Sequence, residues 1–123
     1  MVLPHVASAC RSTVRSQLDA LRTHDAKRAL SCSTPGRQRY GTPEQFLETI
    51  ARTLPQLVYF LTAEFERPHE VEGRVAQPVR LTSPDGSTLR ALYLLEEQPD
   101  GRWLIDQCVC AAAHAPKGGL RRC

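Results

Sequence analysis

Nucleophiles and potential metal ligands are present in this chain, but their spacing does not assemble them into a recognisable reactive group. Ser31, Cys32 and Ser33 stand together, yet no His is placed by sequence to activate them, so we interpret the cluster as loop polarity. Cys108 and Cys110 have no second Cys or His pair at metal-ligand spacing. The four histidines are scattered singly: His5, His24, His69 and His114. We therefore expect no metal site and no cofactor.

General acid–base catalysis needs a titratable side chain in a pocket, and the later strands offer two candidates, Tyr93 and Asp106. Successive side chains of a strand point to opposite faces. Tyr93 therefore falls on the apolar, inner face, whereas Asp106 lies opposite Trp103 and Ile105. Asp106 is either a pocket base or an exposed, edge-facing carboxylate, and the cost of burying an unpaired acid favours the second. We expect no catalytic residue; an enzyme would have to use Asp106 or Tyr93.

Neutral amides are the polar side chains that the inner face predicts for a ligand pocket. Gln77 and Gln107 alternate with apolar residues of the later strands, and Gln17 lies within the apolar arc of the first helix. Amides can bind one another, the backbone or a water molecule, but they do not titrate. The predicted pocket is lined by Gln17, Gln77, Tyr93, Trp103 and Gln107.

A short basic segment, Arg37, Arg39 and Tyr40, precedes a strongly capped helix. These side chains could hold an anion together with the free N–H groups of that helix. The composition favours the other interpretation, a solvent-facing loop.

The composition limits the class of protein. The 123 residues, 41% of them hydrophobic and with a net charge of +3, suit one globular domain. No apolar run approaches the roughly 20 residues that cross a bilayer. Five cysteines without a secretory signal favour reduced thiols and a cytoplasmic location, although an Arg- and Ser-rich start leaves organellar import open. Without a Gly-rich phosphate loop or an aromatic–basic platform, we expect neither nucleic acid nor membrane as a partner.

Helices are predicted in the first half of the chain. Apolar residues at helical spacing mark the first of them: Val6, Cys10, Val14, Leu18 and Leu21. Asp25 is a good N-cap for a short second helix. Thr42 and Gln45 form a capping box for a third, which is expected to end at Pro55.

Strands are predicted after residue 56, where the apolar period changes to two. They cover residues 57–66 and 71–82, the second with Gly73 and Pro78 as bulge or edge signals. Pro-Asp-Gly occurs at residues 84–86 and 99–101, and Asp-Gly between extended segments is a hairpin signal. Helices followed by an antiparallel meander indicate a single α+β domain over residues 1–110, with residues 111–123 as a flexible tail.

The whole pattern resembles the nuclear transport factor 2-like superfamily, which includes SnoaL-like and ketosteroid isomerase-like proteins. The resemblance rests on the helix order and on a meander closed by DGRWLI. The stretches RYGTPEQFLETIARTLPQLVYF, RVAQPVRLTSPDG and LYLLEEQPDGRWLI are similar to one uncharacterised bacterial family of that group, a domain of unknown function. The resemblance implies a cystatin-like cone, with N-terminal helices packed on a curved antiparallel sheet. The isomerase-like members need a carboxylate base facing a Tyr and a protonated Asp, and this sequence offers no inward acid to match them.

We therefore expect a small non-catalytic domain that binds a small apolar ligand or a protein partner. A homodimer would form through the outer face of the sheet, which is partly apolar. An isomerase, cyclase or hydratase that uses a pocket in the cone is the alternative. A second alternative is an assembly domain of a larger complex, suggested by seven Lys or Arg against two Asp in residues 1–43.

Overall fold

The computed structural model describes residues 1–112 and 121–122, with side chains described up to Ala111. Helices occupy the first half of this part of the chain: α1 (Pro4–Arg22), α2 (Ala26–Ser31), α3 (Pro35–Gln38), α4 (Pro43–Thr53) and α5 (Gln56–Tyr59). Strands follow: β1 (Thr62–Phe65), β2 (His69–Val71), β3 (Arg74–Thr82), β4 (Thr88–Glu97), β5 (Trp103–Ala112) and β6 (Arg121–Arg122).

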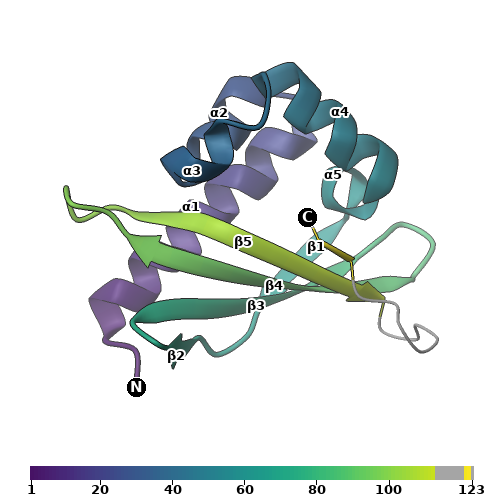
Figure 1. Ribbon diagram of the computed structural model, residues 1–123. Coiled ribbons are helices and arrows are strands. Elements are labelled where there is room, and N and C mark those ends of the chain that lie inside the picture. The colour runs from purple at the N-terminus through teal and green to yellow at the C-terminus, as the bar shows by residue number, and fades with distance from the viewer. Residues whose placement is uncertain (113–120, 123) are drawn as a thin grey trace.

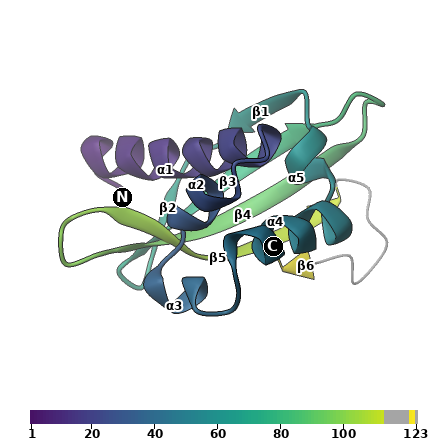
Figure 2. The same cartoon turned by 90° about the horizontal axis from the view of Figure 1, so that it is seen from above.

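The strands form one antiparallel sheet with the order β1-β3-β4-β5-β6, and β2 pairs with the start of β3. In Figure 1, α2 to α5 gather above the sheet, while α1 passes behind it. Figure 2 shows α1 running beside β1 and β3, with α4 over β5. α1 packs against β3 and β5, and α4 packs against α2 and α5. The predicted α+β fold, with N-terminal helices on an antiparallel sheet, is confirmed.

The predicted helix starts are confirmed at two positions. The Asp25 side chain accepts a hydrogen bond from the backbone N–H of Arg28 at 3.2 Å. At α4, Thr42 Oγ1 accepts from the N–H of Gln45 at 3.1 Å, and Gln45 Oε1 accepts from the N–H of Thr42 at 2.9 Å. This capping box holds the loop before α4 against the helix.

The prediction of a strand from residue 57 is wrong for its first half. Pro55 ends α4 but starts α5, because a proline fits the start of a helix as well as it breaks the interior of one. Leu57 and Val58 are buried and Tyr59 is exposed, which is the pattern of a helical turn. Two adjacent buried positions in a short segment do not distinguish a turn of helix from a strand.

The predicted long strand over residues 71–82 is a hairpin followed by a strand. Glu72 and Gly73 have φ values of 50° and 80° and connect β2 to β3. Two successive residues with positive φ are typical of a type I′ hairpin turn. Gly73 therefore marks a turn and not a bulge.

Both Pro-Asp-Gly segments are hairpin turns, as predicted. Gly86 and Gly101 have φ values of 85° and 89°, which L side chains rarely adopt. In the first turn Asp85 Oδ1 accepts from the N–H of Ser87 at 2.9 Å, and in the second Asp100 Oδ1 accepts from the N–H of Arg102 at 3.0 Å. Hydrogen bonds from the hydroxyl and the N–H of Ser87 lower the pKa of Asp85, and hydrogen bonds from the N–H and the guanidinium of Arg102 lower the pKa of Asp100.

A β-bulge at Asp106 overturns the predicted face of the second half of β5. Leu95 pairs with Ile105 but Leu94 pairs with Gln107, so one extra residue lies between them. An extra residue reverses the alternation of the side chains that follow. Gln107, predicted to point inward, therefore shares the outer face with Leu94, and the half-buried Val109 follows it.

Cys108 and Cys110 take the inward positions that were predicted for Gln107 and Val109. They pair with Tyr93 and Ala91 and belong to the buried core. Their burial is the expected one for cysteine, which is among the most buried residue types.

The predicted tail is partly built into the sheet. β5 runs to Ala112, and Arg121–Arg122 pair with it as β6. Residues 113–120 and 123 lie outside the described residues.

Candidate functional site

The two buried glutamines of the predicted pocket are held by backbone hydrogen bonds. Gln17 donates from Nε2 to the carbonyl of Ala29 at 3.0 Å and joins α1 to α2. Gln77 donates from Nε2 to the carbonyls of Glu66 and Pro78, both at 2.8 Å. Each amide thus satisfies buried carbonyl groups of the fold.

The aromatic residues of the predicted pocket lie in or against the hydrophobic core. Tyr93 is 0% exposed, and its hydroxyl has no hydrogen-bond partner among the described residues. Burial raises the pKa of Tyr93 well above its ordinary value. Trp103 is partly buried against the same core. The structure does not bring these two residues together with Gln17, Gln77 and Gln107 around one described cavity.

Asp106 lies at the bulge, in a polar cluster that joins three segments. Its carboxylate lies 3.3 Å from a guanidinium nitrogen of Arg74 and accepts from Thr34 Oγ1 at 3.2 Å. Its backbone carbonyl accepts from Arg37 at 3.3 Å. Arg74 also lies 3.6 Å from Glu96, which is on the outer face of β4. Asp106 thus belongs to the outer side of the sheet, whereas Tyr93 points inward.

The cysteines divide into two groups. Cys10 and Cys32 are free and buried, and burial raises the pKa of Cys10 to about 11 and raises that of Cys32. The Sγ atoms of Cys108 and Cys110 are 3.9 Å apart, too far for a bond to each other. Each of them has a further interaction, so neither is a free thiol. The expectation of reduced thiols therefore stands for Cys10 and Cys32 alone.

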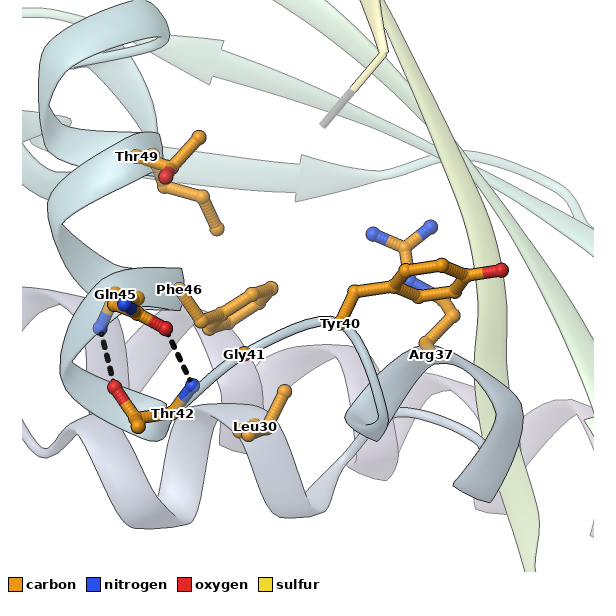
Figure 3. Close-up of a pocket in the computed structure, with 9 residues that line it drawn as sticks. Leu30, Arg37, Tyr40, Gly41, Thr42, Gln45, Phe46 and Thr49 are labelled. Atoms are coloured by element: carbon orange, nitrogen blue, oxygen red, sulfur yellow. Dashed lines mark hydrogen bonds between the residues drawn. The ribbon is translucent and has the colours of Figure 1, made fainter.

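A pocket of about 310 Å³ opens between α2, the α3–α4 loop and α4, and we name it the α4 pocket (Figure 3). Its apolar wall consists of Leu30, Phe46 and Ile50. The remaining lining residues are polar or belong to the loop: Arg37, Tyr40, Gly41, Thr42, Gln45 and Thr49. Its volume is at the lower end of the range of small-molecule sites, about 300–1,000 Å³.

The rim of the α4 pocket carries a cation and an aromatic ring. In Figure 3 the guanidinium of Arg37 and the ring of Tyr40 lie close together, across the pocket from Phe46. Arg37 is half-buried; burial lowers its pKa, and the negative charge of Asp106 opposes that effect. Tyr40 is 91% exposed, so its ring is accessible to a molecule in the pocket.

Gly41 in the pocket wall has a backbone conformation that favours glycine. Its φ is 149°, and a Cβ atom there would lie 2.8 Å from Gln45 Oε1. That oxygen is the acceptor of the capping box. A larger residue would be strained at this φ and would displace the Gln45 amide from its hydrogen bond to Thr42.

Sequence reasoning singled out Arg37 and Tyr40 but preferred a solvent-facing loop for them. The structure places both at the α4 pocket, together with the capped start of α4. It leaves Arg39 outside the lining. Nothing in the sequence marks Leu30 and Ile50 as pocket residues, because both occupy positions typical of the buried face of an amphipathic helix.

Residues 1–112 and 121–122 contain neither a group of metal ligands nor a membrane-spanning helix. That part of the chain contains no group of three or more His, Cys, Asp or Glu that could hold a metal ion. A membrane-spanning helix is also absent from it, because each described helix is too short or too polar.

Helices packed on an antiparallel sheet, with a pocket between α2 and α4, define a small α+β protein with a candidate ligand site among its helices. Residues 5–118 match the family described as a domain of unknown function (DUF4864), and the chain belongs to that family. The expected similarity to an uncharacterised family is thus confirmed. No curated protein matches the chain.

Proposed function

We propose that this protein is a non-catalytic binding domain whose α4 pocket takes a small apolar molecule that carries an anionic group. The observation behind the proposal is the combination of an apolar wall with Arg37 at the rim. An aromatic or aliphatic body would pack against Phe46, Ile50 and Leu30. A guanidinium suits a carboxylate, because its charge strengthens each hydrogen bond that it donates. Arg37 would make this contact in addition to its hydrogen bond to the backbone carbonyl of Asp106.

We also propose that the fold is a variant of the nuclear transport factor 2-like cone. The support is the order of elements, a long first helix and short helices before an antiparallel meander that closes with Trp103. The difference in the present chain is the place of the pocket, which lies among the helices beside α4.

Benzoate is a suitable probe for the α4 pocket, with benzamide as its uncharged counterpart. We expect benzoate to shift the backbone amide resonances of Phe46 and Thr49 in ¹⁵N-correlated NMR spectra, with a dissociation constant in the millimolar range. Arg37→Gln should weaken benzoate binding about tenfold, since a charge-assisted hydrogen bond is worth about 1.5–3 kcal/mol.

Arg39→Gln is the matched control, because Arg39 belongs to the same loop but does not line the pocket. Its affinity for benzoate should stay within twofold of the parent protein. Equal losses in both variants would mean that benzoate senses only the general positive charge of the loop, and the proposal would be abandoned.

A homodimer through the outer face of the sheet is the second candidate function. Apolar residues follow one another in a stripe across three strands of that face: Ala76 and Pro78, which are buried, Leu94 and Val109, which are half-buried, and the exposed Leu92. Leu92 is 43% exposed. Ion pairs border the stripe, among them Arg80–Glu64 at 3.0 Å and Arg90–Glu66 at 2.7 Å. An apolar centre with a charged rim is the usual composition of a protein interface.

Light scattering across a range of protein concentrations would test the dimer. Leu92→Arg should convert a dimer to a monomer, since it places a charge in the centre of the stripe. Leu61→Arg is the control, because Leu61 is 57% exposed but lies outside the stripe. A parent protein that is monomeric at all concentrations would rule the dimer out.

A further inference from the structure

A second hollow, of about 290 Å³, lies beside the N-terminal half of α1, and we name it the α1 hollow. Its lining consists of Pro4, Ala7, Ser8, Arg11, Pro68 and Gln77. None of these residues lines the α4 pocket. The two concavities are therefore separate.

Gln77 offers an oriented hydrogen-bond acceptor to the α1 hollow. The residue is 1% exposed, and both hydrogens of its Nε2 are used by the carbonyls of Glu66 and Pro78. These two bonds fix the orientation of the amide, so Oε1 is the atom with remaining capacity. No donor from the described residues reaches that oxygen. A molecule that donates to Oε1 from within the hollow would therefore gain a hydrogen bond with a fixed, oriented acceptor.

Arg11 supplies a positive charge to the same hollow. Its guanidinium lies 5.3 Å from the centroid of the Phe65 ring, a cation–π contact that holds the side chain over the sheet. Among the described residues, no carboxylate lies within 4 Å of Arg11. The hydroxyl of Ser8, one turn away on α1, is a further donor for an anion.

We propose that the α1 hollow binds a small carboxylic acid that carries a hydroxyl or amino group on the carbon next to its carboxylate. The hydroxyl or amino group donates to Gln77 Oε1, and the carboxylate accepts from Arg11 and Ser8. Apolar substituents of the acid pack against Pro4, Ala7 and Pro68. A plain carboxylic acid lacks the hydrogen bond to Gln77 Oε1, and a neutral amide leaves the arginine without an anion.

Three related probes separate these contributions: mandelate, phenylacetate, which lacks the hydroxyl, and mandelamide, which lacks the charge. In ¹⁵N-correlated NMR titrations of the full chain, mandelate should shift the backbone amides of Ala7 and Ser8 and the side-chain amide of Gln77. We expect phenylacetate to bind about fivefold more weakly and mandelamide at least tenfold more weakly at these resonances. Only the probe changes in this comparison, and the protein stays the same. The difference in affinity between mandelate and phenylacetate therefore measures the hydrogen bond to Gln77 without altering the core.

Two arginine variants complete the test. Arg11→Gln should weaken mandelate binding about tenfold. Arg15→Gln is its matched control, because Arg15 also lies over Phe65, at 4.9 Å, but does not line the hollow. It should change the affinity less than twofold.

Three results would overturn the proposal: no shifts at Ala7, Ser8 and Gln77, equal affinities for mandelate and phenylacetate, or equal losses in the two arginine variants. Shifts confined to Phe46 and Thr49 would likewise overturn it and would assign mandelate to the α4 pocket. The outcome at the α1 hollow is therefore independent of the function proposed for the α4 pocket.

Discussion

Replacing Tyr93 by Ala is expected to destabilise the protein by about 3–5 kcal/mol, the range for removal of a large aromatic side chain from a core. Tyr93 is 0% exposed in the middle of β4, and its ring lies in the cluster that joins the sheet to the helices. Urea unfolding followed by the fluorescence of Trp103, the single tryptophan, would measure the change.

Replacing Tyr93 by Phe should have the opposite sign. The tyrosine hydroxyl is buried without a partner among the described residues, and an unmade hydrogen bond of this kind costs about 1–3 kcal/mol. Tyr93→Phe keeps the packing and removes that atom, so we expect a gain of about 1 kcal/mol. A loss of 1 kcal/mol or more would show that the hydroxyl has a partner, such as a buried water, and would return Tyr93 to the list of functional residues.

The second large effect is the loss of stability when an aspartate replaces a residue on the inner face of β5 after the bulge, compared with the outer face. Cys108→Asp should destabilise the protein by about 3–5 kcal/mol, because it leaves a buried charge without a partner. Val109→Asp should cost less than about 1.5 kcal/mol, because Val109 is half-buried on the outer face, where the new carboxylate reaches solvent.

Cys108→Ala is the control for the first of these variants, since it removes the sulfur without adding a charge. Urea midpoints of the three variants and the parent protein would give the comparison. A regular strand without a bulge predicts the reverse order, with Val109→Asp the more damaging change. That result would contradict the pairing of Leu94 with Gln107.

The bulge explains why alternation alone placed Gln107 wrongly in the predicted pocket. Counting every second residue from Trp103 and Ile105 placed Gln107 inward, and one extra residue reversed the outcome. The residue types did indicate the observed orientation, because cysteine is usually buried and glutamine is usually exposed, and Cys108 and Cys110 stand next to and near Gln107. Without knowledge of the partner strand, however, a residue count cannot tell a bulge from regular pairing.

The sequence by itself determined the features that depend on neighbouring residues. The capping box of Thr42 and Gln45, the N-cap at Asp25 and both Pro-Asp-Gly turns follow from local hydrogen bonds and from the freedom of glycine, so they could be predicted correctly. The order of helices and strands followed from the same local signals and led to the α+β class.

Only the tertiary structure decided where the candidate sites lie. Arg37 and Phe46 line one pocket because α4 packs against α2, and Gln77 and Arg11 line one hollow because α1 packs on β3. These pairs are separated by 9 and 66 residues, and contacts of that kind depend on how whole elements pack. Periodicity shows which face of an element is buried, but it does not show which other element covers that face.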